Sequence, residues 1–213
     1  MSVALEGVSF AYGNDAKVVD NVSFRVGPGE AIALVGPSGS GKSTLLAIIG
    51  LLLLPDTGFV KFGDVVVEQR GRRRKSLRVS EVAWVFQGLN ILGRRTVLDN
   101  ATLGLLAHGF TRRSARESAM KQLSALGLED LVDRTVDTLS GGQLQRVCIA
   151  RALAMTPRVL LADEPTGQLD GSTSELVIES LLGAARAAHT SLVVATHDRE
   201  VVASCDRVIE MVR

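Results

Sequence analysis

Cysteine is scarce in this chain of 213 residues, which contains only Cys148 and Cys205. Two isolated cysteines do not make a disulfide framework, and neither belongs to a cluster with the spacing of metal ligands. The scarcity argues against a disulfide-stabilised scaffold and against a cysteine-based metal centre. Cys148 falls at helical spacing with Leu144, Ala152 and Met155. We therefore expect a buried thiol in a reducing compartment.

An excess of charge of one sign and long apolar segments are also missing. The net charge is +1, so no global basic field favours nucleic acid, and we expect no nucleic-acid partner. Residues 1–10 lack the basic start and apolar core of a secretory signal. The longest apolar run, residues 45–54, is interrupted by Gly50 and is shorter than the roughly 20 residues that span a bilayer. We expect a core helix there, and membrane association only through a partner protein.

What the sequence does contain is a series of short apolar segments that are typical of strands. Four of them are continuously apolar, as in strands buried on both faces of a parallel sheet, and helical patterns lie between them. They cover residues 31–35, 82–86, 159–162 and 192–195. A last apolar piece covers residues 208–212. On the N-terminal side, an antiparallel sheet is expected from strands at residues 3–5, 19–26, 59–62 and 65–67.

The stretch between residues 86 and 139 has a helical period in place of such strands. Ala115, Ala119, Leu123 and Leu126 recur on one helical face. The sequence therefore predicts a single α/β domain over residues 1–213. It consists of a mostly parallel sheet, an N-terminal antiparallel β-subdomain and a helical subdomain inserted at about residues 88–140.

The segment from Gly36 to Ser43 matches the pattern G-x-x-x-x-G-K-[ST] of a phosphate-binding loop, with a buried strand before it and an apolar helix after it. Its glycines let the backbone direct N–H groups at phosphate oxygens, and the helix N-terminus adds partial positive charge. Lys42 is expected to reach the β- and γ-phosphates, and Ser43 to ligate Mg²⁺. The core is therefore predicted to be a P-loop NTPase. Its nucleotide-binding residues are Gly36, Pro37, Ser38, Gly39, Ser40, Gly41, Lys42, Ser43 and Thr44.

Two carboxylates, Asp163 and Glu164, follow the apolar segment at residues 159–162. Ligands of open α/β sheets bind beyond the carboxyl ends of the strands. Asp163 is therefore predicted to enter the Mg²⁺ shell, directly or through water. Glu164 is predicted to act as general base for the attacking water. A solvated strand end is the alternative for this pair taken alone.

A second anion site is indicated by Leu139-Ser140-Gly141-Gly142-Gln143, ahead of a predicted helix over residues 144–155. Ser140 suits a helix N-cap, and the two glycines leave backbone N–H groups exposed. One nucleotide cannot easily use both sites of one subunit if the helical insertion separates them. Two chains arranged head to tail bring the phosphate loop of one to this segment of the other.

This order of motifs resembles the ATP-binding cassette (ABC) family along essentially the whole chain. The resemblance implies that Tyr12 stacks on adenine, that Gln87 contacts Mg²⁺ and the attacking water, and that His197 contacts the γ-phosphate. Residues 139–143 correspond to the family signature, and Asp170 closes the loop that meets the partner subunit. Taken singly, Tyr12 has an alternative as a surface aromatic, Gln87 as a loop residue and His197 as a helix N-terminal residue.

The resemblance implies an ATPase whose two identical subunits enclose two Mg-ATP molecules and power substrate translocation by an integral membrane permease. The cofactors are ATP and Mg²⁺, and the location is cytoplasmic, peripheral on the inner face of the cell membrane. Residues 164–170 resemble the branch of macrolide exporters, lipoprotein-release ATPases and the cell-division ATPase. That branch usually has asparagine at the position of Gln168 and a proline after Gln87 that this chain lacks.

Three other functions are weighed against transport. A mechanotransmitter, which relays force to a membrane protein that transports nothing, is the alternative function. A DNA-repair or chromosome ATPase carries a very long coiled coil between the motifs, whereas only a short insertion separates Gln87 from Ser140 here. A translation-factor cassette normally has two copies in one chain, and this chain has one.

Two groups of basic residues have no role in the nucleotide site. The run formed by Arg70, Arg72, Arg73, Arg74, Lys75 and Arg78 is expected to be a solvated loop, with contact to lipid headgroups or a permease as the alternative. By resemblance, the stretch after Gln87 and the helices behind it receive the permease. Candidates for that contact are therefore Arg94, Arg95, Arg112 and Arg113.

Overall fold

The computed structural model describes residues 2–13, 16–67, 71–167, 169 and 171–211. Asp170, Gln168, Arg70 and Val212, which the sequence analysis singles out, lie outside the described residues. In chain order the elements are β1 (Val3–Phe10), β2 (Val19–Val26), β3 (Ala31–Val35), α1 (Lys42–Ile49), β4 (Thr57–Phe62), β5 (Val65–Val66), α2 (Arg72–Glu81), β6 (Val82–Val85), α3 (Val97–Ala107), α4 (Arg112–Ala125), the 3₁₀ turns η1 (Glu129–Leu131) and η2 (Val136–Thr138), α5 (Gly141–Ala154), β7 (Val159–Asp163), α6 (Gly171–Ala187), β8 (Ser191–Ala195), α7 (Arg199–Ser204) and β9 (Arg207–Glu210).

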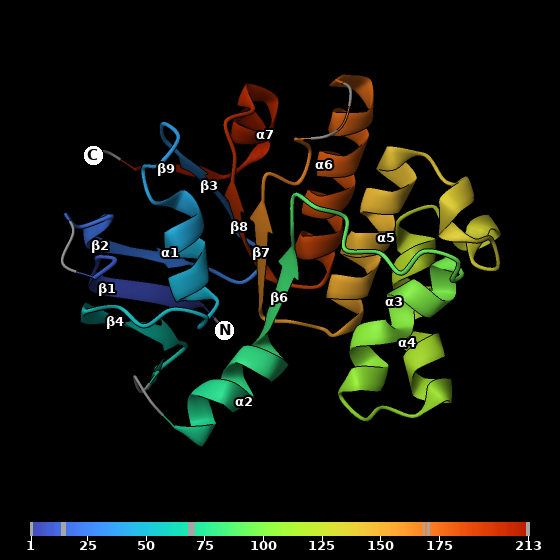
Figure 1. Cartoon of the computed structure of the whole chain (residues 1–213), viewed down its shortest axis with the longest axis horizontal. Coiled ribbons are helices and arrows are strands. Elements are labelled where there is room, and N and C mark those ends of the chain that lie inside the picture. Colours follow the sequence, from blue (N-terminus) through green and yellow to red (C-terminus); the bar gives the residue numbers. More distant parts are fainter. Residues whose placement is uncertain (1, 14–15, 68–70, 168, 170, 212–213) are drawn as a thin grey trace.

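The strands form two sheets, as predicted (Figure 1). Strands β2-β1-β4-β5 make the antiparallel sheet, and strands β6-β7-β8-β3-β9 make the parallel one. Within the parallel sheet, β7, β8 and β3 are neighbours. The carboxyl ends of parallel strands meet at one edge of the sheet, so the segments that follow these three strands lie close together at that edge.

The parallel sheet is buried on both faces, which explains its continuously apolar strands. Ile32 and Leu161 belong to a core that includes α1 and the antiparallel sheet. Leu160, the neighbour of Leu161 in β7, belongs to the other core, which includes α5 and α6. Figure 1 shows α1 on one side of the parallel sheet and α5 and α6 on the other. Successive side chains of a strand point to opposite faces of the sheet, so two adjacent apolar residues pack into different cores.

The helical period predicted before residue 139 corresponds to α4, preceded by α3. The predicted apolar face is confirmed, because Ala115, Ala119, Leu123 and Leu126 are all buried. Both helices pack against α5 (Figure 1). Among the described residues, no helix combines the length and apolarity needed to cross a bilayer.

Two predictions about helices are wrong. The core helix expected over residues 45–54 ends at Ile49, where Gly50 is the C-cap, although Leu51 beyond it is still buried. The part of the basic run from Arg72 to Arg78 lies in helix α2, not in a loop. Leu77 packs against the core and Arg74 donates a hydrogen bond to the Leu53 carbonyl, so tertiary contacts stabilise a helix that its charge pattern alone does not favour.

Candidate nucleotide-binding site

The loop between β3 and α1 has backbone conformations that require glycine at two positions. Gly41 has φ of 92°, and a side-chain Cβ there would lie 2.5 Å from the Val18 carbonyl oxygen. A Cβ at Gly36 would lie 2.6 Å from both the Met211 carbonyl oxygen and Ser40 Oγ. The loop is therefore packed tightly on its outer side. Ser40, a predicted nucleotide-binding residue, is buried and does not line the cleft described below.

Helix α1 begins at Lys42 directly after this loop. Its N-cap, Gly41, provides no side-chain hydrogen bond, so the first N–H groups of the helix are not capped by that residue. Lys42 Nζ donates hydrogen bonds to the carbonyl oxygens of Gly36 at 2.7 Å and Pro37 at 3.1 Å. The ammonium group therefore lies across the loop, where an oxyanion can replace the carbonyl oxygens as its partner.

The two carboxylates stand at the end of β7, next to the end of β8. Asp163 pairs with Ala195 in the parallel register, and the Glu164 backbone N–H donates to the Ala195 carbonyl at 2.9 Å. Glu164 has φ of 47°, a left-handed conformation that is uncommon for a residue with a side chain. Such strain is concentrated at functional sites. Here it turns the chain beyond β7 toward the segment that follows β8.

Glu164 is hydrogen-bonded to two residues beyond β8. His197 Nδ1 donates to Glu164 Oε1 at 2.8 Å, and Thr196 Oγ1 donates to Glu164 Oε2 at 3.3 Å. The Glu164 side chain is only 17% exposed, whereas that of His197 is 77% exposed. The hydrogen bond to Glu164, followed by the charge of that carboxylate, raises the pKa of His197 above its ordinary value. The sequence analysis predicted both residues but not their direct contact.

The pKa shift of His197 predicts a pH dependence that NMR can measure. A raised folded-state pKa means that the pair stabilises the fold fully below the unfolded-state pKa of about 6.5 and loses this contribution as pH rises through the folded-state value. We expect the imidazole of His197 to titrate at lower pH in Glu164→Gln than in the wild type. Because His197 is exposed, the effect on the free energy of unfolding is small. An unchanged titration curve would contradict the contact.

One cleft is lined by most of the residues that were predicted for the phosphate and metal sites of a single subunit. It has a volume of about 770 Å³. Tyr12 is half exposed beside it, with its hydroxyl 3.2 Å from Thr44 Oγ1 and its ring edge-on to Phe10 at 4.9 Å. The cleft is lined by Tyr12, Val18, Gly36, Pro37, Ser38, Gly39, Gly41, Lys42, Ser43, Thr44, Gln87, Asp163, Glu164 and His197.

The segment from Leu139 to Gln143 is not part of that cleft. Ser140 caps α5 as predicted, and its side chain and that of Gln143 each bond the other residue's backbone N–H. A Cβ at Gly142 would lie 2.3 Å from Thr173 Cγ2, so glycine allows the close packing of α5 on α6. Ser140 and Gly141 are exposed. Within the described residues, the two predicted anion sites of one subunit are therefore separate.

Comparison with known proteins assigns this arrangement to a family. A family model described as "ABC transporter" matches residues 19–167. The chain belongs to the ABC transporter family. It is an ATP-binding cassette, and ATP hydrolysis is its activity.

The relatives of this cassette include lipoprotein-releasing system ATP-binding proteins LolD. The protein from Cereibacter sphaeroides is 41% identical over 98% of this chain and 96% of its own length. The protein from Granulibacter bethesdensis is 44% identical over 89% of this chain and 83% of its own length. These relatives confirm the resemblance to the lipoprotein-release branch, despite Gln168 and the absent proline.

Solved structures give the same assignment for the fold. The dimeric ATP-binding cassette MJ0796 in a post-hydrolysis state, bound to ADP and Pi, is 34% identical, with a TM-score of 0.82 over 98% of this chain and 94% of that chain. CbiO1 of Clostridium perfringens, part of the ABC transporter complex cbiONQ, is 28% identical, with a TM-score of 0.90 over 98% of this chain and 84% of that chain. The predicted combination of two sheets and helices is thus the ABC cassette fold.

The cassette also holds a loop whose anchors the sequence analysis missed. The Cys148 thiol donates to the Leu89 carbonyl at 2.8 Å, and Arg151 donates to the Asn90 carbonyl at 2.8 Å. Asn100, fully buried in α3, accepts from the backbone N–H of Leu92 at 2.8 Å and donates to its carbonyl at 3.1 Å. These bonds fix the segment that follows Gln87. The available signal was an asparagine on an otherwise apolar helical face.

Burial of Cys148 is confirmed, and its role is structural. Burial raises the pKa of its thiol to about 11, so the reactive thiolate is scarce near neutral pH. The pKa of the Cys205 thiol is likewise raised to about 11, mainly by burial. Both cysteines are free thiols.

Proposed function

We propose that this cassette works as a homodimer that encloses two Mg-ATP molecules, each held by the phosphate loop of one subunit and residues 140–143 of the other. The separation of Ser140 from the cleft carries this proposal. One subunit supplies the phosphate loop, the carboxylates Asp163 and Glu164, and His197. The N-terminus of α5 offers N–H groups elsewhere, and a second copy is needed to bring them to the same nucleotide.

In this proposal Tyr12 stacks on adenine, and the residues from Gly36 to Thr44 surround the phosphates, with the buried Ser40 acting through its backbone. Asp170 closes the loop that meets the partner subunit. The phosphate loop follows β3, the two carboxylates stand at the end of β7, and His197 follows β8. Because three neighbouring strands of one sheet hold these groups, the site is rigid where charge develops. The helices between about residues 88 and 140 form a subdomain that carries the signature toward the partner.

The oxygen donors in the cleft fit Mg²⁺. The Ser43 hydroxyl, the Asp163 carboxylate and the Gln87 amide all line it. Mg²⁺ in nucleotide sites usually takes one or two protein carboxylates and completes its shell with phosphates and water. When bound, the metal neutralises phosphate charge.

Glu164 is the proposed general base. Its carboxylate accepts a proton from the water that attacks the γ-phosphate, while the Gln87 amide orients that water. His197 donates to Glu164 at 2.8 Å. We propose that the γ-phosphate competes for His197, because both are anionic acceptors. Binding of ATP then frees the carboxylate for proton transfer.

The work of the dimer is proposed to be transport. The cassette is peripheral on the cytoplasmic face of the membrane, where two subunits dock on an integral permease near the segment that follows Gln87. Anchoring of that segment by Asn100 and Arg151 supports a mechanical link between the cleft and the docking surface. The LolD relatives, whose name refers to lipoprotein release, favour transport over the mechanotransmitter alternative.

Two substitutions at one position test the composite site. Ser140→Asp and Ser140→Asn both keep a residue that caps helices well, so α5 is preserved in each. Only aspartate places a negative charge opposite the triphosphate of the partner. At about 4 Å this repulsion is about 4 kcal/mol, so we expect ATP turnover at least about a hundredfold lower in Ser140→Asp than in Ser140→Asn.

The affinity of the isolated subunit for ATP is the internal control. It is measured by calorimetry at a protein concentration below that of dimerisation. We expect the same affinity in both variants, because Ser140 lies outside the cleft of its own subunit. Equal turnover in the two variants would remove residues 140–143 from the nucleotide site.

A further inference from the structure

Helix α2 is strongly basic, although the whole chain has a net charge of only +1. Its 10 residues include five cations and one carboxylate. That carboxylate, Glu81, already pairs with Arg158, which lies outside the helix, at 2.8 Å. Among the described residues, no ion pair joins a cation of α2 to a carboxylate. The cations are Arg72, Arg73, Arg74, Lys75 and Arg78.

One side of α2 is held against the protein, and the other side faces outward. Leu77 packs against the core, and Arg74 donates a hydrogen bond to a backbone carbonyl at 2.9 Å. Arg72, Arg73 and Lys75 are exposed. Because Arg72 and Lys75 are three residues apart, they lie on the same face of the helix. The packing of Leu77 therefore directs the cations of the first turn away from the core.

The cations of α2 lie close to one another and to the positive end of the helix. Four of them are consecutive, at residues 72–75 in the first turn, where the helix dipole disfavours positive charge. Burial, followed by the charge of Arg78, lowers the pKa of Arg74 below its ordinary value. An anionic surface next to the first turn relieves this repulsion. Charge complementarity therefore indicates an anionic partner for the outward face.

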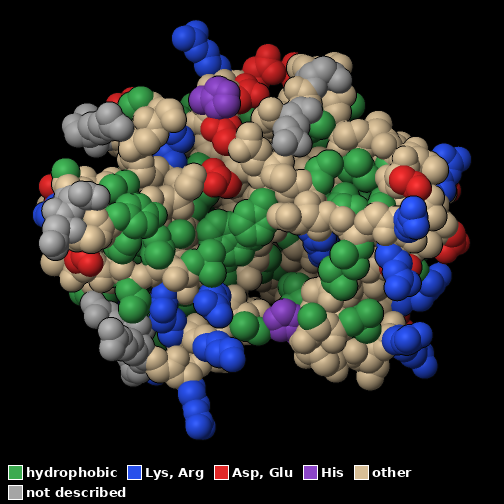
Figure 2. Space-filling model, in the orientation of Figure 1, with side chains coloured by type: hydrophobic (Ala, Val, Ile, Leu, Met, Phe, Trp, Pro, Cys, Tyr) green, Lys and Arg blue, Asp and Glu red, His purple; other side chains and the backbone are tan. Residues whose placement is uncertain are grey.

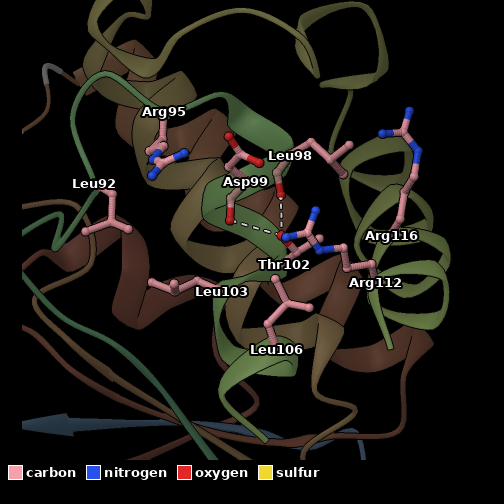
Figure 3. A pocket seen from close by; sticks show the side chains of 9 residues that line it. All are labelled: Leu92, Arg95, Leu98, Asp99, Thr102, Leu103, Leu106, Arg112 and Arg116. Atoms are coloured by element: carbon pink, nitrogen blue, oxygen red, sulfur yellow. Dashed lines mark hydrogen bonds between the residues drawn. The ribbon is translucent and has the colours of Figure 1, made fainter. Parts of the chain in front are cut away.

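The surface proposed for permease docking determines how α2 is oriented at the membrane. The cavity beside α3 and α4, with a volume of about 450 Å³, is lined by Leu92 of the segment after Gln87 (Figure 3). In the view of Figure 2, Lys and Arg side chains over α2 and over α4 stand on either side of a hollow with hydrophobic side chains. Helix α2 therefore lies on the same face as the docking region. A permease docked on this face holds α2 next to the membrane.

The outward face of α2 fits a lipid surface. It is a convex ridge of long side chains, because the cations extend from one exposed helix. Clusters of four to eight Lys and Arg residues on a helix at the cytoplasmic side of a membrane are typical of segments that bind anionic lipids. Arginine bonds phosphate oxygens in pairs, and lysine adds a mobile charge. A fluid layer of headgroups can adjust to such side chains.

We propose that α2 binds the anionic lipid headgroups beside the permease through Arg72, Arg73 and Lys75 on its outward face. The cassette then has a direct contact with the membrane in addition to its association through a partner. The inference rests on the proposed docking for the orientation of α2. Lipid binding itself requires neither nucleotide nor permease. Two docked subunits present two such helices to one membrane, which strengthens the attachment.

Flotation of the complete chain with vesicles tests this contact. Vesicles of phosphatidylcholine mixed with phosphatidylglycerol are compared at low salt with vesicles of phosphatidylcholine alone. Each basic residue near an anionic membrane strengthens binding by about fivefold. We therefore expect the wild type to bind the mixed vesicles and Arg72→Gln/Lys75→Gln to bind them roughly 25-fold more weakly. High salt should weaken the binding of the wild type, because it screens exposed charges.

Lys61→Gln/Arg186→Gln supplies the comparison, because it removes the same net charge elsewhere. Both cations are already paired, Lys61 with Glu6 at 2.6 Å and Arg186 with Asp206 at 2.9 Å. This variant should bind the mixed vesicles as tightly as the wild type. The affinity for ATP shows that each double variant is folded, since none of the four substituted residues lines the nucleotide cleft.

An NMR experiment identifies the surface that contacts lipid. Spin-labelled phosphatidylcholine is included in nanodiscs of the mixed lipids, and it broadens the signals of nearby amide groups. We expect the broadening to centre on residues 72–76. Broadening centred on another surface, or none, would contradict the proposal.

The other opposing outcomes are also distinct. Failure of the wild type to bind mixed vesicles, or equal binding of the wild type and the α2 variant, overturns the proposal. Equal weakening in both double variants would show that only the net charge matters. Binding of polyglutamate without binding of vesicles would assign α2 to an acidic protein segment, and the inference of a lipid partner would be wrong. Failure of permease docking would leave the vesicle result unchanged, so the two proposals fail separately.

Discussion

Glu164→Gln is expected to lose ATP turnover by about 10²- to 10⁴-fold while it retains ATP binding, because an amide cannot accept the proton of the attacking water. Glutamine has nearly the same shape as glutamate and can still bond Thr196 and His197, so the cleft keeps its geometry. Hydrolysis reopens the dimer in the proposed cycle. The variant should therefore accumulate as an ATP-bound dimer.

Turnover is measured as phosphate release, and the dimer by light scattering with and without Mg-ATP. Glu200→Gln is the matched control, since Glu200 is an exposed glutamate in the first turn of α7 and does not line the cleft. It should hydrolyse ATP as the wild type does. Normal turnover in Glu164→Gln would exclude the assigned base, and a monomer with bound ATP would exclude the composite dimer.

Lys42→Ala is expected to weaken ATP binding by about 10- to 100-fold. Hydrogen bonds to charged groups contribute about 1.5–3 kcal/mol, which corresponds to this range of dissociation constants. The ammonium of Lys42 already lies over the loop, bonded to two carbonyls that a phosphate oxygen can replace. Little reorganisation is then needed when the nucleotide binds.

The dissociation constant is measured by calorimetry with ATP and Mg²⁺. Lys61→Ala is the control, because Lys61 also makes a short contact, 2.6 Å to Glu6, but on the antiparallel sheet. Circular dichroism shows whether each variant is folded, since Lys42 also braces the loop. A folded Lys42→Ala protein with wild-type affinity would contradict the assignment of the phosphate site.

Local patterns predicted much of the fold. The strands buried on both faces follow from their continuously apolar sequences, because each successive side chain meets a different core. The cap of α5 follows from Ser140 and Gln143. Helix α2 did not follow, since its charges disfavour a helix, and contacts of Leu77 and Arg74 with residues distant in the sequence stabilise it.

The candidate site likewise combines features predicted from the sequence with contacts that depend on the tertiary structure. The phosphate loop and the two carboxylates carry local signals, namely a glycine pattern and a strand end, whereas Tyr12, Gln87 and His197 were predicted by family resemblance. The hydrogen bond between Glu164 and His197 carries none, because it depends on β7 and β8 being neighbours. The anchors of the segment after Gln87 are likewise contacts between residues far apart in the chain, as between Cys148 and Leu89.

The sequence by itself predicted the chemistry proposed for this protein: a loop that must be rich in glycine, a lysine and hydroxyls for phosphate, carboxylates at a strand end, and a separate capped helix. These features depend on backbone conformation and on neighbours within a few residues. Only the tertiary structure decided which groups face one another, namely His197 on Glu164 and Cys148 on the Leu89 carbonyl. Strand order and helix packing bring these groups together across long stretches of chain, and short-range patterns do not encode that proximity.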